Sequence, residues 1–334
     1  MALDPARNGP GGGSRDIFQL GTRPDRIRHC RPARLAAVSR SVVWASGDGI
    51  VLRTVDGGQS WQNVAPPGAV DLRFWDIEAF DSDNAVLLAI GPDARIYRTQ
   101  DGGASWTQTF HNTDKHAFYA AIAFSDPLRG LALSHPVGGK FRVLRTADGG
   151  QTWELVPPAG MPPASPNEFA FAAAGTAMVS RGQDTWFGTG NPQGARVFRS
   201  PDGGTTWSVA TTPVRRGHDA GIFSLAFRDS SVGLAVGGDQ KKLGTAVDAA
   251  ARTVDGGKTW TLVGPEAPAG LRTGSAWLGD TALAVGPTGS DVSTDGGQTW
   301  RLFDTGFFVH VASTQDGTCW ASGEKGTVAR LVVS

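Results

Sequence analysis

Arg145-Thr-Ala-Asp-Gly-Gly-Gln-Thr-Trp153 is the stretch that decides the fold, because the chain repeats it. Six segments share Asp-Gly-Gly followed, after one variable residue, by a hydroxyl residue and Trp. The other five are Arg53–Trp61, Arg98–Trp106, Arg199–Trp207, Arg252–Trp260 and Val292–Trp300. Successive tryptophans lie 45, 47, 54, 53 and 40 residues apart. A period in this range is typical of propellers and other repeat arrays.

Each repeated segment, which we name a box, contains what a tight turn between antiparallel strands requires. The Asp carboxylate can accept backbone N–H groups, and two glycines tolerate positive φ. The Trp can pack back across the turn. A Ca²⁺ loop would need several alternating oxygen ligands, whereas each box has one Asp. We therefore interpret the box residues as structural: Asp56, Asp101, Asp148, Asp202, Asp255, Asp295, Trp61, Trp106, Trp153, Trp207, Trp260 and Trp300.

Two apolar strands recur between the boxes, which gives each unit four strands, A to D. Strand C leads into the box, and strand D follows the box Trp. Strands A and B are apolar on both faces, as expected for a sheet packed between two others. The A runs include 77–80, 122–124 and 225–227, and the B runs include 85–91, 130–134, 233–237 and 281–286.

The chain contains seven such units. Six have a box, and the seventh begins at Phe308 and lacks both a box and a D strand. Asp16–Gly21 precedes the first unit and resembles a D strand, so we predict that it completes the seventh blade and closes the ring. The predicted fold is all-β, a seven-bladed β-propeller of four-stranded antiparallel blades. We expect residues 15–334 to form this single domain and residues 1–14, rich in Gly and Pro, to be a disordered leader.

The sequence resembles the photosystem II stability/assembly factor-like family of Asp-box (bacterial neuraminidase repeat) propellers, in its non-photosynthetic bacterial branch. Besides the boxes, the resemblance rests on segments 76–81, 139–141, 160–163, 221–227 with 237–239, and 323–326. It covers roughly residues 16–332. It implies a seven-bladed propeller and a non-catalytic role, since the photosynthetic relatives act as chaperones of membrane-complex assembly. Many relatives are exported, and this chain departs from them by lacking a visible export signal.

Composition argues against several classes of function. Lys and Arg number 31 and Asp and Glu 31, so no net charge attracts the chain to nucleic acid. No segment approaches the roughly 18 apolar residues of a membrane helix, and no signal-peptide core is visible. We expect a cytoplasmic monomer without a cofactor. Cys30 and Cys319 fit a reducing compartment, but the predicted fold places them on neighbouring blades, which leaves a disulfide between them open.

Strand order divides the propeller into two faces. Box turns join C to D on one face, the box face. The D-to-A and B-to-C connections meet on the opposite face around the central funnel, and we name this the loop face. Loops on one side of a rigid scaffold commonly carry binding residues. The candidates there are Asp71, Arg73, His116, His135, Lys140, Glu168, His218, Asp239, Arg272 and Lys325.

Specific chemistries find little support in the sequence. A sialidase-like site needs an arginine cluster and a Tyr nucleophile. The chain has two tyrosines, Tyr97 and Tyr119, and Tyr97 lies beside a box in strand C, where we expect it to pack. Glycosidase action needs two facing carboxylates, and no pair is singled out among the acidic loop residues. Metal binding is not predicted because no two of the four funnel histidines, His116, His135, His218 and His310, have ligand-type spacing.

We therefore favour a non-catalytic binding protein that engages a protein partner or a small acidic ligand through the loop face. The alternative is a glycan-active hydrolase or lyase that uses carboxylates and histidines of the funnel. Two carboxylates about 5–10 Å apart over a deep pocket would favour the enzyme. A shallow charged rim would favour the binding protein.

Overall fold

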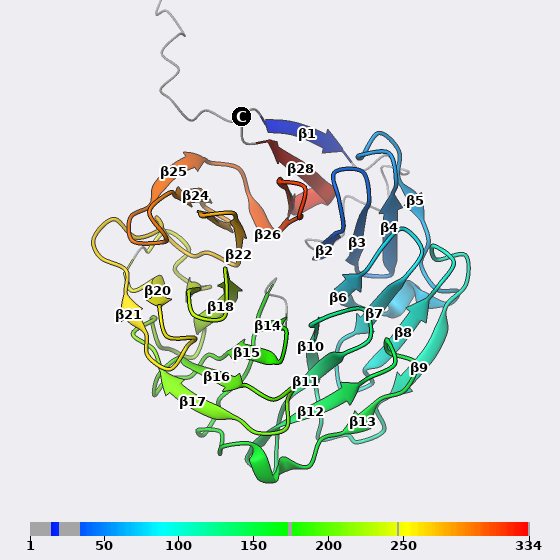
Figure 1. The fold of residues 1–334 in the computed structure, drawn as a ribbon, viewed down its shortest axis with the longest axis horizontal. Helices are drawn as coiled ribbons and strands as arrows, with labels where there is room; N and C mark the ends of the chain where they lie inside the picture. The colour runs from blue at the N-terminus through cyan, green and yellow to red at the C-terminus, as the bar shows by residue number, and fades with distance from the viewer. Residues whose placement is uncertain (1–14, 20–33, 173–175, 246, 333–334) are drawn as a thin grey trace, which may run out of the picture.

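The described part of the chain forms a ring of seven antiparallel sheets (Figure 1). The structure is a computed structural model that describes residues 15–19, 34–172, 176–245 and 247–332. Each sheet has four strands, and successive strands of the chain are neighbours in it, except that β1 lies beside β28. The predicted seven-bladed all-β propeller is therefore confirmed.

Blades 1 to 4 follow one another in chain order, each from strand A to strand D. Blade 1 contains β2 (Arg34–Ala37), β3 (Val43–Gly47), β4 (Ile50–Thr54) and β5 (Gln62–Asn63). Blade 2 contains β6 (Phe74–Ala79), β7 (Ala85–Ala89), β8 (Arg95–Thr99) and β9 (Thr107–His111). Blade 3 contains β10 (Tyr119–Phe124), β11 (Gly130–Val137), β12 (Lys140–Thr146) and β13 (Glu154–Leu155). Blade 4 contains β14 (Met178–Arg181), β15 (Asp184–Gly188), β16 (Arg196–Ser200) and β17 (Ser208–Thr211).

Blades 5 to 7 complete the ring. Blade 5 contains β18 (Ala220–Phe227), β19 (Gly233–Asp239), β20 (Ala250–Thr253) and β21 (Thr261–Leu262). Blade 6 contains β22 (Gly274–Leu278), β23 (Thr281–Gly286), β24 (Gly289–Ser293) and β25 (Arg301–Asp304). Blade 7 contains β26 (Phe308–Ser313), β27 (Thr318–Gly323), β28 (Thr327–Val332) and β1 (Arg15–Gln19). Short 3₁₀ turns, η1 (Ala69–Asp71), η2 (Pro158–Gly160) and η3 (Glu324–Gly326), lie in the connections.

The hydrophobic core lies between neighbouring blades. Strand β7 is buried at every residue, whereas the outer strand β13 is exposed at both of its residues. One apolar cluster joins Leu131 and Leu133 of blade 3 to Met178, Phe187 and Phe198 of blade 4. The A and B strands are continuously apolar because each of these sheets is covered on both faces.

The boxes form hydrogen-bonded turns. In the first box, Thr54 Oγ1 donates to Asp56 Oδ1 at 2.8 Å and accepts the N–H of Gly58 at 3.0 Å. Gly57 and Gly58 have φ of 75° and 86°, a backbone region that disfavours other residues. Hydrogen bonds from the side chain and backbone of Ser60 lower the pKa of Asp56 to about 2. This carboxylate is therefore ionised at neutral pH and is occupied within its own turn.

The boxes also connect neighbouring blades through their arginines. Arg98 Nε donates to the carbonyl of Gly149, in the next box, at 2.9 Å. Arg252 Nε donates to the carbonyl of Gly296 at 2.6 Å in the same way. The box glycines meanwhile bond to the A-to-B turn of their own blade, as in blade 2, where the N–H of Gly102 donates to the carbonyl of Asp83 at 3.0 Å. The A-to-B turns therefore lie on the box face with the boxes.

The N-terminal strand β1 is the outermost strand of blade 7. It pairs antiparallel with β28, with Arg15 opposite Leu331 and Gln19 opposite Thr327. The predicted strand spanned residues 16–21, of which 20 and 21 lie outside the described residues, as does the predicted leader of residues 1–14. Blade 7 therefore contains strands from both ends of the chain.

The composition led to expectations about membrane helices and about the two cysteines. Among the described residues, no helix has the length and apolar character needed to cross a membrane. Cys319 is a free, buried thiol, and burial raises its pKa to about 12, so it is not a nucleophile. Cys30 lies outside the described residues.

Candidate functional site

Two of the residues predicted to bind a partner are buried and already paired. Glu168 is 4% exposed and accepts hydrogen bonds from Thr189 Oγ1 at 2.7 Å and from Arg196 Nε at 2.9 Å. Arg272 is 0% exposed, and its Nε donates to Asp291 Oδ2 at 2.6 Å. Arg272 was predicted as a binding residue of the loop face, but its guanidinium is enclosed and holds the loop to strand β24.

Three further predicted residues hold the loops of their own blades. The His135 ring stacks on Phe118 with centroids 4.8 Å apart, and burial lowers its pKa, so the ring is neutral near pH 7. Lys140 Nζ donates to the carbonyl of Pro158 at 2.9 Å. Asp239 accepts a backbone N–H of its own turn at 2.9 Å. These residues are half-buried, and their polar groups are largely used within the fold.

The other described candidates are exposed on the loop face: Asp71, Arg73, His116 and His218. Arg73 lies over the ring of Trp75, with 5.4 Å between its Cζ and the ring centroid. His116 Nδ1 lies 3.2 Å from Asp114 Oδ1. Lys325 falls within η3, but its side chain lies outside the part of the chain that the structure describes. The side chains of Asp71, Arg73, His116 and His218 remain available to a partner.

Aromatic side chains accompany the exposed charges of the loop face. Trp75 and Phe118 are half-buried at or just before the A strands of blades 2 and 3, and Phe169 is half-buried in the connection that leads to blade 4. Phe307, just before β26 of blade 7, is 36% exposed. Partly exposed aromatic rings beside arginine and histidine are typical of protein-binding surfaces.

A second candidate site is a cavity of about 700 Å³ in the central channel. Its lining residues come mainly from A strands and A-to-B turns, among them Glu78, Thr176, Arg181, Ser275, Trp277 and His310. Because Arg181 and Asp280 at the A-to-B turns are exposed, the cavity reaches the surface on the box face. None of the nine predicted residues with described side chains lines this cavity.

Ionisable groups from three blades gather beside this cavity. Arg34 of blade 1 forms an ion pair with Asp76 of blade 2, with Nη2 and Oδ1 3.1 Å apart. Burial raises the pKa of Asp76 to about 6 against the opposing effect of Arg34. Burial, and then the charge of Asp76, raises the pKa of Glu78 to about 8. His310 of blade 7 accepts the N–H of Leu35 through Nδ1 at 3.4 Å, and burial keeps the pKa of its ring well below 6.5.

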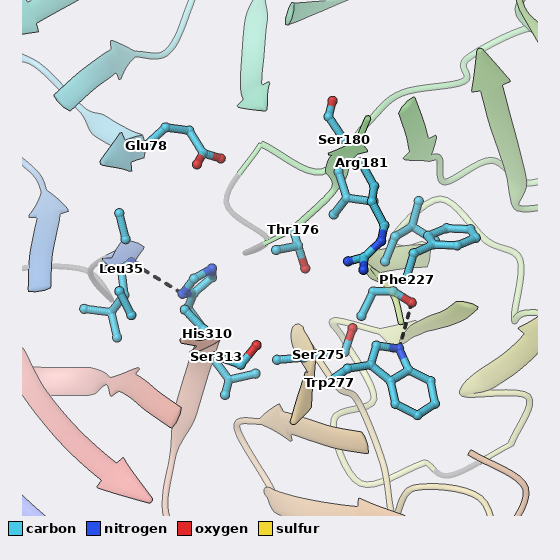
Figure 2. Close-up of a pocket in the computed structure, with 18 of the residues that line it drawn as sticks. Leu35, Glu78, Thr176, Ser180, Arg181, Phe227, Ser275, Trp277, His310 and Ser313 are labelled. Atoms are coloured by element: carbon cyan, nitrogen blue, oxygen red, sulfur yellow. Dashed lines mark hydrogen bonds between the residues drawn. The ribbon is translucent and has the colours of Figure 1, made fainter. Parts of the chain in front are cut away.

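The opposite wall of the cavity contains hydroxyl groups. Thr176 Oγ1 is hydrogen-bonded to Ser224 Oγ, which lies 2.8 Å from Ser275 Oγ. Figure 2 shows the carboxyl group of Glu78 and the guanidinium of Arg181 directed into the cavity from opposite sides. The cavity therefore offers a carboxyl group, a guanidinium and several hydroxyl groups.

This arrangement does not match a glycosidase. Asp76 is buried, and its oxygens contact Arg34 and the N–H of Ile122, so it cannot reach a substrate. Glu78 lies two residues away on the same strand, so the two carboxyl groups do not flank a common space as paired catalytic carboxylates do. Burial raises the pKa of Tyr119 to about 12, which makes this phenol a poor nucleophile. Among the described residues, no group of His, Cys, Asp and Glu could hold a metal ion.

Sequence reasoning missed Arg34, Glu78 and Arg181 as members of a site. One signal was available, because Asp76-Ile-Glu78 places two charges at alternate positions of a strand that is otherwise apolar. In a propeller, such positions face the channel or a neighbouring blade. Arg34 and Arg181 had no comparable signal, since each lies at an end of a short strand.

The comparisons with known proteins agree with this architecture. Residues 291–302 match the BNR/Asp-box repeat family. No curated protein sequence matches the chain. The chain is similar in structure to YCF48 bound to D1 peptide, with a TM-score of 0.67 and 18% identity, covering 100% of this chain and 99% of that one.

Two other solved structures are similar to most of the chain. One is YCF48 from Cyanidioschyzon merolae, with a TM-score of 0.66, 17% identity and coverage of 95% of this chain and 98% of that one. The other is the Neurospora crassa Pan2 WD40 domain, with a TM-score of 0.65, 12% identity and coverage of 95% of both chains. At these identities the likeness concerns the fold. It is consistent with the family resemblance seen in the sequence.

Proposed function

We propose that this Asp-box propeller is a non-catalytic binding protein that engages a protein partner through its loop face. The observation that carries the proposal is the combination of partly exposed aromatic rings with exposed charges on consecutive blades. Trp75, Phe118 and Phe169 supply apolar contact area, Arg73 supplies charge, and His116 supplies a polar ring beside them. Aromatic residues and arginine are enriched among the residues that contribute most to protein–protein affinity.

Two further points support a binding function over the alternative hydrolase or lyase. Asp76 and Glu78, the two acidic residues of strand β6 beside the channel, lie on one strand and do not face each other across a substrate-sized space as the paired carboxylates of glycoside hydrolysis do. In addition, one protein of similar fold has been solved with a bound peptide. A rigid propeller that binds an extended segment of another protein requires no catalytic group.

The proposal can be tested with two matched double variants. In the first variant, Arg73→Glu reverses a charge on the loop face and His116→Glu adds a negative charge there, and both side chains are exposed. Lys258→Glu with Arg301→Glu makes the same type of change at exposed sites away from that face. Affinity capture from the source cells, followed by quantitative mass spectrometry, identifies proteins bound by the unmodified chain. Binding of the identified partner is then measured with purified proteins.

We expect the loop-face variant to lose partner binding by at least about tenfold, because a central charge at an interface is seldom reversed without loss. Both variants should keep the melting temperature within about two degrees, since exposed substitutions cost little stability. Retained binding in the loop-face variant, or equal loss in the control variant, would refute the assignment to this face.

A further inference from the structure

Two residues that line the central cavity, Arg34 and His310, each have a buried nitrogen without a partner in the protein. The Nε atom of Arg34 and the Nε2 atom of His310 are both buried without a hydrogen bond. His310 is 3% exposed, lines the cavity, and directs its second ring nitrogen toward the middle of it (Figure 2). Since buried polar groups are normally satisfied, these two atoms point to a group that the protein itself does not supply.

The tautomer of His310 follows from its contacts. Nδ1 accepts the N–H of Leu35 at 3.4 Å, so it carries no proton. The ring is neutral, because burial and then the charge of Arg34 hold its pKa well below 6.5. The proton therefore resides on Nε2, and the unpartnered atom is a donor. A ligand that meets His310 Nε2 must present a hydrogen-bond acceptor.

The charges around the cavity leave one cation uncompensated. Arg34 is paired with Asp76. Arg228 is paired with Asp280, with Nη1 and Oδ1 2.9 Å apart. Arg181 has no ion pair within the described part of the chain, and its guanidinium extends into the cavity (Figure 2). A guanidinium in a partly enclosed space favours a carboxylate, which it can bind through two parallel hydrogen bonds.

The remaining polar groups favour hydroxyl groups on the same ligand. Thr176 and Ser275 are hydroxyl donors and acceptors on the wall formed by blades 4 to 6. Glu78 faces them from blade 2 and, because its carboxyl group is largely protonated at neutral pH, it can both donate and accept. A cavity of about 700 Å³ lies within the usual range of small-molecule sites.

We propose that the central cavity is a binding site for a small hydroxylated organic acid. Its carboxylate binds Arg181, and its hydroxyl groups bind Glu78, Thr176, Ser275 and His310. This site opens on the box face, so it is separate from the loop face proposed for the protein partner. The two proposals can therefore fail independently.

Isothermal titration calorimetry on the full chain tests the proposal with defined probes. The probes are D-gluconate and D-glucuronate, which carry a carboxylate and several hydroxyl groups, and D-glucose, which is neutral. At about pH 6.5, where Glu78 is protonated, we expect at least one acid to bind and glucose to bind at least about tenfold more weakly. Arg181→Gln, at an exposed position, should weaken acid binding by at least about tenfold. Arg301→Gln, an exposed arginine on the outer strand β25, is the matched control and should leave acid binding unchanged.

The pH dependence provides a second readout. Glu78 experiences the charges of Asp76 on its own strand and of Arg34 on β2, and Arg181 and His310 lie across the cavity from it. When Glu78 ionises, its charge repels the bound acid, so affinity should fall between about pH 7 and pH 9. Glu78→Gln should remove this fall. Absence of binding by both acids up to about 10 mM, or binding that Arg181→Gln does not weaken, would overturn the proposal.

Discussion

Replacing Glu78 by Gln should make the protein more stable at alkaline pH. In the folded chain the pKa of Glu78 is raised from 4.5 to about 8, first by burial and then by Asp76. Below pH 4.5 Glu78 is protonated in both the folded and the unfolded chain, so its contribution to stability is complete. As the pH rises to about 8 the unfolded chain ionises first, and that stability is lost. The rise corresponds to at most about 5 kcal/mol. It is an upper limit, because the side chain is partly exposed to the cavity and is not enclosed on all sides.

The assay is urea unfolding of both proteins at a series of pH values. Burial raises the pKa of Asp76 to about 6, so ionisation of Asp76 also lowers the free energy of unfolding as the pH rises. Most of this decrease is complete by about pH 6 in both proteins. The informative window is therefore between about pH 6 and pH 9. There the free energy of unfolding should fall in the unmodified protein and stay level in Glu78→Gln.

A matched control separates burial from the chemistry of the substitution. Glu266→Gln makes the same change at an exposed position and should leave the pH profile of the unmodified protein in place. If Glu78→Gln and the unmodified protein have the same profile between about pH 6 and pH 9, Glu78 is already ionised at neutral pH. That result would refute the reasoning about its environment, and with it the hydrogen-bonding role assigned to Glu78 in the cavity.

Three further predictions concern the scaffold. Trp207→Ala should cost about 3–5 kcal/mol in urea unfolding, because this box indole is buried at 8% exposure, and the half-buried Trp153 should cost less when changed in the same way. Equal losses at the two positions would contradict the difference in burial. Arg272→Met should also destabilise, by about 3–5 kcal/mol, since it leaves the buried carboxylate of its partner uncompensated. An unchanged free energy of unfolding would show that Arg272 is not needed for charge balance. Removing residues 1–19 should lower the melting temperature by about 5 °C or more and promote aggregation, because it exposes the edge of β28, whereas removing residues 1–14 should change neither. Equal melting temperatures in the two truncated chains would exclude a stabilising role for β1.

The structural role of the boxes could be read from the sequence because their interactions are local. Thr54 bonds to Asp56 two residues away, and Asp56 accepts the N–H of Ser60 four residues away. Nine residues are therefore sufficient to specify the turn. The boxes then marked six of the seven blades, since each turn marks the passage from strand C to strand D, and the strands from Phe308 onward supplied the seventh. The contact from each box to the next blade, such as Arg98 to Gly149, was beyond this reasoning, because it joins residues of different repeats.

The candidate binding residues were less predictable. The sequence places polar residues in loops, but it does not say which of them find partners when the blades assemble. Arg272 looked like an exposed cation of a connecting loop, yet Asp291 lies nineteen positions further along the chain and is brought to it by the B-to-C geometry of blade 6. Arg73 lies over Trp75 and His116 lies beside Asp114, but both side chains stay exposed.

The sequence by itself determined the repeat, the seven four-stranded blades and the face on which the boxes lie. These properties depend on turn chemistry and strand periodicity, which act over a few residues. Only the tertiary structure decided which side chains line the central cavity. Leu35 and His310 meet although they are 275 positions apart, because the ring brings the first blade against the last. Burial around the central channel, which no local pattern encodes, raises the pKa of Glu78 and leaves donors of Arg34 and His310 without partners.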